Sequence, residues 1–370
     1  MIVIITQCYP PKIGGIENLI FNLSYYLSRH EKVIVLADGH NAMQDNEFDR
    51  NYLNNFQIKR FGGIKFLRKR NKNKELKKII SFQSVKAIIS DSWKSLEYPI
   101  TQLRKKKIPT YSLVHGNEII IKNKKHYDRI FNTLSNVDKI ICNSNFTLEL
   151  LKKINPHLNK TEVIYPGVMD FEKIKDQNID NIKGQPVILT LARLEKRKGH
   201  AEILKAIAAL KENYNKICYI IAGDGEELNN LKKLCLKLKI EKHVKFISSI
   251  NDNQKKFIFK KTDIMVMPTI DETDNRSIEG FGISYIEAAL FGIPSIASKV
   301  GGTPEAVIHN KTGIIINNIK DLKINIEELI KNEDKRLMLG ENAKKRALKE
   351  LHWKDQIKKY ISLFSNNKKT

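Results

Sequence analysis

Two glutamates, Glu279 and Glu287, bracket a pair of glycines in the stretch Glu279-Gly-Phe-Gly-Ile-Ser-Tyr-Ile-Glu287. A short apolar run precedes this stretch and apolar residues recur at helical spacing after it, which predicts strand, loop and helix in that order. A helix N-terminus that carries glycines offers free backbone N–H groups to an anion. Glutamates at this spacing also arise by chance, but a second glycine turn at 301–305 makes the setting more specific. We therefore predict a ligand site rather than a solvated helix start.

Three other segments place glycines or cations directly after a predicted strand. They are Gly14-Gly15, the basic loop Arg193-Leu-Glu-Lys-Arg-Lys-Gly199 and the turn Gly223-Asp-Gly225. Strand, glycine loop and helix form an arrangement that is typical of phosphate binding. The dinucleotide fingerprint Gly-x-Gly-x-x-Gly and the P-loop lysine are both missing from the first segment, so neither dinucleotide binding nor NTPase activity is predicted.

Strands and helices alternate along the whole chain, which predicts an α/β fold with mostly parallel, doubly wound sheets. We expect two Rossmann-like domains that face each other across a cleft. The first spans 1–168, a linker follows at 169–186, and the second spans 187–351. The C-terminal helix, 352–370, is expected to pack back on the first domain. Two such domains suit group transfer from a phosphorylated donor, because ligands bind at the carboxyl ends of parallel strands.

Composition narrows the classes of protein. The chain has 370 residues, of which 41% are apolar and 29% charged, as is ordinary for a globular protein. No apolar run reaches the roughly 18 residues of a membrane span, and no cleavable signal precedes the first strand, so we expect a cytoplasmic protein. The four cysteines are widely spaced and no Asp-x-Asp pair occurs, so no metal or redox motif is present.

The formal net charge is +24, which favours an acidic partner, although the chain is rich in lysine throughout. Residues 59–78 stand out, because ten lysines and arginines there face only Glu75 and apolar residues are interleaved with them. This pattern is typical of a surface for anionic lipid headgroups, on a protein peripheral to the inner face of the membrane. A solvated face and a nucleic-acid contact are the alternatives.

Six motifs, in this order and spacing, resemble the retaining glycosyltransferases of family 4, which have the GT-B fold. The similarity covers nearly the whole chain and is closest to bacterial mannosyltransferases that act on lipid acceptors. The motifs are Pro10–Glu17, Val114–Glu118, Val163–Val168, Ala192–Gly199, Ala222–Gly225 and Glu279–Glu305.

The resemblance implies a role for each candidate residue. The expected catalytic residues are His115 near the reacting carbon, Glu279 on the donor sugar hydroxyls, and Arg193 with Lys198 on the donor diphosphate. Two fixed cations suit a leaving phosphate on which negative charge develops. The expected donor-binding residues are Gly14, Gly15, Asp224, Phe281, Gly282, Ile283 and Glu287, the last of them on the ribose. Gly14 and Gly15 could instead form only a tight turn, and Asp224 could be only a turn former.

The implied reaction moves a hexose from a nucleotide sugar to a lipid-linked or saccharide acceptor with retention of configuration. The resemblance favours GDP-mannose as donor, with UDP-hexoses as the alternative, and implies neither cofactor nor metal. Retention is expected to proceed by same-face substitution, in which the leaving phosphate takes the acceptor proton. Two other functions remain possible: a nucleotide-sugar epimerase on the same scaffold, and a basic nucleic-acid-binding protein, for which no binding motif is present.

Overall fold

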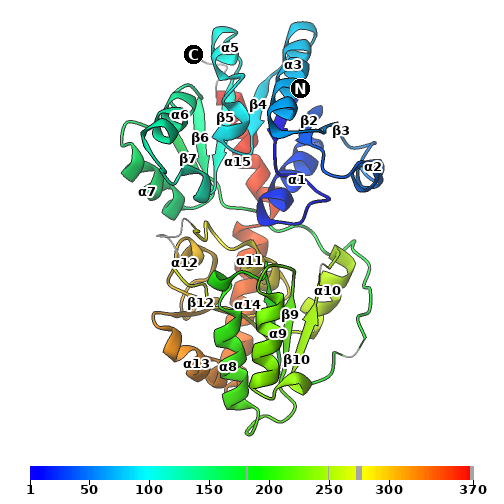
Figure 1. Ribbon diagram of the computed structural model, residues 1–370, viewed down its shortest axis with the longest axis vertical. Helices are drawn as coiled ribbons and strands as arrows, with labels where there is room; N and C mark the ends of the chain where they lie inside the picture. Colours follow the sequence, from blue (N-terminus) through cyan, green and yellow to red (C-terminus); the bar gives the residue numbers. More distant parts are fainter. Residues whose placement is uncertain (181, 249, 272–276, 367–370) are drawn as a thin grey trace. The chain divides into compact units, whose positions relative to one another are not determined.

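The computed structural model describes residues 1–180, 182–248, 250–271 and 277–366 (Figure 1). The chain divides into two compact units. The first comprises Met1–Gly167 together with the C-terminal segment from Trp353, and the second comprises Val168–His352. Each unit is built on one sheet of parallel strands connected by helices, which confirms the predicted fold class.

The first unit has a seven-stranded sheet in the order β3-β2-β1-β4-β5-β6-β7. Its strands are β1 (Ile2–Thr6), β2 (Val33–Asp38), β3 (Gln57–Phe61), β4 (Ala87–Ser90), β5 (Thr110–Val114), β6 (Lys139–Cys142) and β7 (Thr161–Val163). Its helices are α1 (Gly15–Leu27), α2 (Ala42–Arg50), α3 (Lys65–Phe82), α4 (Trp93–Leu96), α5 (Ile100–Lys105), α6 (Lys124–Leu134), α7 (Asn145–Ile154) and α15 (Trp353–Asn366).

The second unit has a six-stranded sheet in the order β10-β9-β8-β11-β12-β13. Its strands are β8 (Val187–Leu191), β9 (Cys218–Ala222), β10 (Val244–Ile247), β11 (Ile264–Met267), β12 (Ser295–Ser298) and β13 (Gly313–Ile316). Its helices are α8 (His200–Leu210), α9 (Leu228–Lys237), α10 (Asp252–Lys261), α11 (Ile283–Leu290), α12 (Thr303–Ala306), α13 (Leu322–Lys331) and α14 (Glu333–Glu350).

Each sheet has one point where the chain reverses its direction of travel across the sheet. In the first unit the strands proceed outward from β1 to β3, and the chain then returns to β4 on the other side of β1. The second unit repeats this pattern between β8 and β11. The loops that follow the two strands at such a switch point diverge, which leaves room for a ligand at the carboxyl edge of the sheet.

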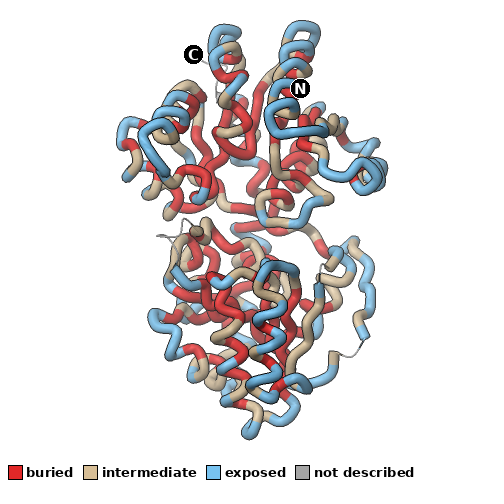
Figure 2. Tube along the Cα trace, in the orientation of Figure 1, coloured by how far each residue is buried: buried red, intermediate tan, exposed pale blue. Residues whose placement is uncertain are grey.

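Burial on both faces explains why the central strands read as apolar runs. All five residues of β1 are buried, as are all four of β11 (Figure 2). Helices cover the sheets, so the strands have no solvent-facing side on which polar residues could alternate. The buried strands therefore give rigid support to the loops at the carboxyl edges.

The C-terminal helix of the chain packs within the first unit, and part of the predicted linker packs within the second. The helix α15 packs on α1, where the rings of Trp353 and Tyr26 stack with centroids 5.9 Å apart. Part of the predicted linker, 169–186, lies against α10. Phe171 packs edge-on against Phe259, with centroids 6.3 Å apart, and Lys260 forms an ion pair with Asp176.

Candidate active site

The carboxyl edge of the second sheet gathers most of the predicted site residues. The basic loop 192–199 follows β8, the loop that contains Glu279 follows β11, and the turn Gly301-Gly302 follows β12. These three strands are neighbours, so their loops emerge side by side. Residues 272–276, which belong to the predicted loop after β11, lie outside the described residues.

Glu279 is held by two cations of the basic loop. Its Oε2 accepts a hydrogen bond from Arg197 Nη1 at 2.9 Å and another from Lys198 Nζ. Burial raises the pKa of the Glu279 carboxyl, but Lys198 and Arg197 lower it by more, so it ends below its ordinary value. An ionised carboxylate only accepts hydrogen bonds, so it suits a residue that is expected to bind sugar hydroxyls, which donate them.

The two predicted diphosphate cations occupy different environments. Lys198 is buried beside Glu279, whereas Arg193 is exposed and pairs with Glu195 at 2.9 Å. The other oxygen of Glu195 accepts from Arg197 Nε, also at 2.9 Å. Charges therefore alternate from Arg193 through Glu195 and Arg197 to Glu279, and Arg193 forms the solvent-facing end of that chain.

Arg197 is a site residue that the sequence alone did not single out. It is one of three consecutive cations, Lys196-Arg197-Lys198, and periodicity does not apply within a short loop. The backbone explains its position, because the Ile270 N–H donates to the Arg197 carbonyl at 2.7 Å and fastens this loop to the loop after β11. The presence of a third cation beside the predicted pair was the available signal.

Close backbone packing fixes the segment between Glu279 and α11. The Gly302 N–H donates to the Glu279 carbonyl at 2.9 Å, and a Cβ on Gly302 would lie 2.1 Å from the Gly280 oxygen. Gly282 has φ +103°, a left-handed conformation that favours glycine. In the described part of the chain no side chain caps α11, which starts at Ile283, and an uncapped helix start is a suitable place for an anion. Phe281 is buried beneath this turn.

Glu287 lies about one turn into α11. Its carboxylate is buried and accepts from Lys255 Nζ of α10 at 3.1 Å. Burial lowers the pKa of Lys255, but the carboxylates of Glu287 and Asp252 raise it by more, so this lysine stays charged. The pair fixes the Glu287 carboxylate at the same sheet edge as Glu279.

Asp224 lies in the turn after β9, and its backbone forms a hydrogen bond with the basic loop. Its carbonyl accepts the Leu194 N–H at 2.9 Å, which ties the turn to the basic loop. A Cβ on Gly223 would lie 2.0 Å from the Ala192 oxygen, so glycine is required for this approach. The Asp224 side chain itself is exposed.

The first unit carries the remaining predicted residues at the carboxyl edge of its own sheet. Gly15 begins α1, and the Glu17 carboxylate folds back so that a Cβ on Gly14 would meet it at 2.1 Å. His115 follows β5 and is buried, with its Nε2 2.8 Å from the Asp91 carbonyl oxygen. Its backbone N–H donates to Glu118 Oε1 at 2.7 Å.

Family models match the two halves of the chain in succession. Residues 13–170 match the model described as Glycosyltransferase Family 4, and residues 171–346 match the model described as Glycosyl transferases group 1. The chain belongs to glycosyltransferase family 4 and has the GT-B fold.

Curated relatives of this glycosyltransferase are distant. A GDP-mannose-dependent alpha-(1-6)-phosphatidylinositol monomannoside mannosyltransferase of Mycobacterium tuberculosis is 27% identical over 171 residues, which is 46% of this chain and 44% of that protein. The chain thus matches less than half the length of that relative. An uncharacterized glycosyltransferase of Methanocaldococcus jannaschii is 29% identical over 352 residues, covering 93% of this chain and 92% of its own.

Solved structures share the fold. HepE of Anabaena in complex with UDP and glucose superposes with a TM-score of 0.80 at 19% identity, covering 99% of this chain and 100% of that chain. Across the described ranges of the glycosyltransferase, no three His, Cys, Asp or Glu side chains gather as they would around a metal ion. Likewise, none of the helices in those ranges is long and apolar enough to span a bilayer.

Proposed function

We propose that this glycosyltransferase moves a hexosyl group, with retention, from a nucleotide sugar to a lipid-linked or saccharide acceptor. The observation that carries the proposal is the cluster of Glu279, Arg197 and Lys198 close to the start of α11, which no described side chain caps. An ionised acceptor of hydrogen bonds, fixed cations and the start of a helix at one edge match the hydroxyls and the diphosphate of a nucleotide sugar.

In the proposed step the bond from the anomeric carbon to the leaving phosphate oxygen breaks, and a bond to the acceptor hydroxyl oxygen forms on the same face. The acceptor proton passes to the leaving phosphate. Lys198 and Arg193 stabilise the charge that develops on that phosphate. Because Arg197 also holds Glu279, Lys198 can turn to the diphosphate without leaving the Glu279 carboxylate unpaired.

Glu279 orients the sugar through its hydroxyls, and the N–H groups of Phe281, Gly282 and Ile283 lie beside the sugar and phosphate. Glu287 accepts from the ribose hydroxyls, a role that its pairing with Lys255 supports by keeping the carboxylate in place. From the first unit, Gly14 and Gly15 are assigned to the diphosphate, and His115 to the region of the reacting carbon. Asp224 completes the donor-binding set.

The reaction is proposed to need neither metal nor cofactor. Divalent ions serve in phosphoryl and glycosyl chemistry by neutralising diphosphate charge. Here, three of the four cations of the basic loop form ion pairs at the carboxyl edge of the second sheet: Arg193, Arg197 and Lys198. Turnover that survives chelation of divalent ions is the expected result.

GDP-mannose is the proposed donor, and a UDP-hexose is the alternative. The first is supported by the name of the mycobacterial relative, the second by the UDP and glucose in the complex of the Anabaena protein. Calorimetry with a panel of GDP- and UDP-sugars distinguishes them. Glu279→Gln should weaken the binding of the intact nucleotide sugar more than that of its nucleoside diphosphate, because only the sugar loses its acceptor.

The matched control for Glu279 is Glu97, which also pairs with two cations but lies outside the predicted donor site. Glu97→Gln should leave donor binding unchanged. Equal binding of nucleotide sugars by the wild type and the Glu279→Gln variant would contradict the assignment of Glu279 to the sugar.

Contact with an anionic membrane surface is proposed for the start of α3. Ile64, Phe66 and Leu67 are 68%, 56% and 43% exposed, and the exposed cations Lys65 and Arg70 lie among them. Apolar side chains flanked by cations are typical of proteins that bind lipid headgroups. The proposed patch is narrower than the predicted 59–78 segment, because five of the ten cations in that segment form ion pairs. These five are Lys59, Arg60, Arg68, Lys69 and Lys72.

A further inference from the structure

Asp91 lies immediately after β4, at the switch point of the first sheet, and is only 2% exposed. We infer that Asp91 is a positioning residue for glycosyl transfer, one that fixes the imidazole of His115 by a hydrogen bond from its ring to the Asp91 carbonyl. This inference rests on the proposed role of His115 in the reaction. No motif in the sequence marks Asp91 as a site residue.

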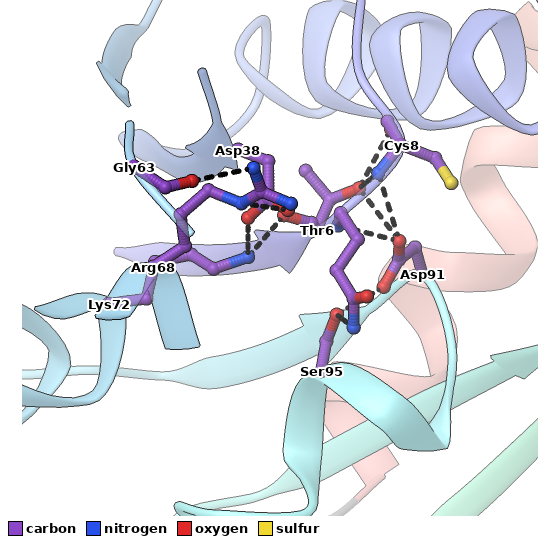
Figure 3. A network of polar contacts seen from close by, with 9 residues as sticks. Thr6, Cys8, Asp38, Gly63, Arg68, Lys72, Asp91 and Ser95 are labelled. Carbon is purple, nitrogen blue, oxygen red and sulfur yellow. Dashed lines mark hydrogen bonds and ion pairs between the residues drawn. The ribbon is translucent and has the colours of Figure 1, made fainter. Parts of the chain in front are cut away.

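The Asp91 carboxylate is anchored by four donors from two segments (Figure 3). Its Oδ2 accepts from the backbone N–H groups of Gln7 at 2.8 Å and Cys8 at 3.2 Å, and from the Thr6 hydroxyl at 3.0 Å. Its Oδ1 accepts from the Ser95 hydroxyl at 2.6 Å. Among the described residues no cation forms an ion pair with it, so these hydrogen bonds are what compensates its burial.

The loop that anchors Asp91 is itself braced from α3. Lys72, buried in α3, donates from Nζ to the Thr6 carbonyl at 2.8 Å and pairs with Asp38 at 2.5 Å. Arg68 pairs with the second oxygen of Asp38 at 3.0 Å (Figure 3). The ends of β1, β2 and β4 are therefore connected, which leaves Asp91 little freedom to shift or rotate.

His115 receives its orientation from this arrangement. A carbonyl oxygen only accepts, so the 2.8 Å contact requires that Nε2 carries the proton and donates to the Asp91 oxygen. In the neutral ring Nδ1 is then the atom that accepts hydrogen bonds, for example from a sugar hydroxyl. The backbone of His115 is held separately by Glu118, so the contact with Asp91 governs the ring rather than the strand end.

A double-mutant cycle on purified full-length protein tests the inference. Asp91→Ala should lower kcat about 100-fold, as expected for a misplacement of about 1 Å, with the donor KM changed less than about 3-fold. If Asp91 acts through His115, Asp91→Ala combined with His115→Ala should be no slower than His115→Ala alone. Effects that multiply would overturn the inference.

Asp138 provides the matched control. Its carboxylate accepts the N–H of Thr110 at 2.7 Å, at the start of β5, and so braces the same sheet at its opposite edge. Asp138→Ala should lower the melting temperature and leave kcat unchanged. If Asp91→Ala behaves in the same way while His115→Ala is impaired, the inference fails and the proposed function stands. A fully active His115→Ala variant would remove both the role of His115 and the inference.

If Asp91→Ala does not fold, a measurement of the His115 tautomer in the wild type tests the inference. NMR of protein labelled with ¹⁵N in its histidines should show His115 as the Nε2–H tautomer. The conservative Asp91→Asn variant keeps one acceptor oxygen for the loop, so it should fold and retain this tautomer. An Nδ1–H tautomer of His115 in the wild type would overturn the inference.

Discussion

At the residue scale, the basic loop contains three consecutive cations that differ in burial: Lys196, Arg197 and Lys198. Lys196 is exposed, whereas the other two are buried against Glu279. A buried charge requires a partner, since removing one member of a buried pair costs about 3–5 kcal/mol. The Glu279 carboxylate and its two buried cations therefore depend on one another for charge compensation. The exposed residues of this loop are not bound by that requirement.

Arg193 offers the most direct test of the diphosphate clamp. Because it is exposed, Arg193→Ala should leave the melting temperature unchanged. Loss of a charged hydrogen-bond donor, worth about 1.5–3 kcal/mol, should weaken nucleoside diphosphate binding about 10- to 100-fold. Calorimetry measures this, with Lys196→Ala from the same loop as the control. Equal affinity of both variants and the wild type would rule out the clamp.

His200, the first residue of α8, is predicted to make stability depend on pH. It is buried, and neither ring nitrogen has a partner among the described residues. Burial, and then the charge of Lys198, lower the pKa of His200 to about 4. The unfolded chain takes up a proton on this residue near pH 6.5 but the folded protein does not, so stability falls as the pH drops from about 6.5 toward 4.

The loss from His200 should reach up to about 3 kcal/mol over that range. Chemical denaturation at pH 7 and pH 5 measures it. His200→Leu should reduce the difference between the two pH values, while His30→Leu, at an exposed histidine, should retain it. An unchanged difference in His200→Leu would show that His200 is not the group that titrates.

At the scale of elements, α3 is longer than its apolar pattern. Apolar residues recur at helical spacing only in its second half, but α3 begins at Lys65. Its first half has no apolar period and is held by ion pairs of Arg68 and Lys72 with Asp38. Partners that are distant in the sequence leave no trace in local periodicity, so this half could not be predicted.

The exposed start of α3 should determine membrane binding. Phe66→Ala combined with Leu67→Ala removes apolar area worth about 1.5–3 kcal/mol for each side chain that enters the interface. Sedimentation with vesicles that contain anionic lipid should show binding weakened at least about tenfold. The control is Leu236→Ala in α9, another exposed leucine on a helix. Vesicle binding equal to that of the wild type would exclude this surface.

At the scale of the whole molecule, charge is divided unevenly between the two units. The first unit contains 33 lysines and arginines against 15 aspartates and glutamates, and the second contains 32 against 26. Three quarters of the net charge thus belongs to the unit that carries the exposed start of α3. This bias supports an anionic partner for the first unit, since electrostatic attraction depends on the charge of the whole surface.

The integrity of the first unit depends on the last segment of the chain. Trp353 is 1% exposed, stacks on Tyr26, and leaves no space for a Cβ on Gly167. Trp353→Ala should cost the first unit about 3–5 kcal/mol, and Trp353→Phe distinctly less. Calorimetry should show an earlier transition for the first unit in the alanine variant and an unchanged one for the second. A single unchanged transition would contradict this dependence.

The sequence by itself determined the fold class and predicted which loops form the donor site. Buried strands and amphipathic helices leave periodic apolar patterns, and glycines mark turns where the backbone must pass closely, as Gly302 does against Gly280. Only the tertiary structure decided which side chains meet. It paired Glu279 with Arg197 as well as Lys198, and it placed half of the cations of the 59–78 segment in ion pairs. It also brought the Asp91 carbonyl into contact with the His115 ring. Such contacts join residues far apart in the chain, and each depends on packing in three dimensions.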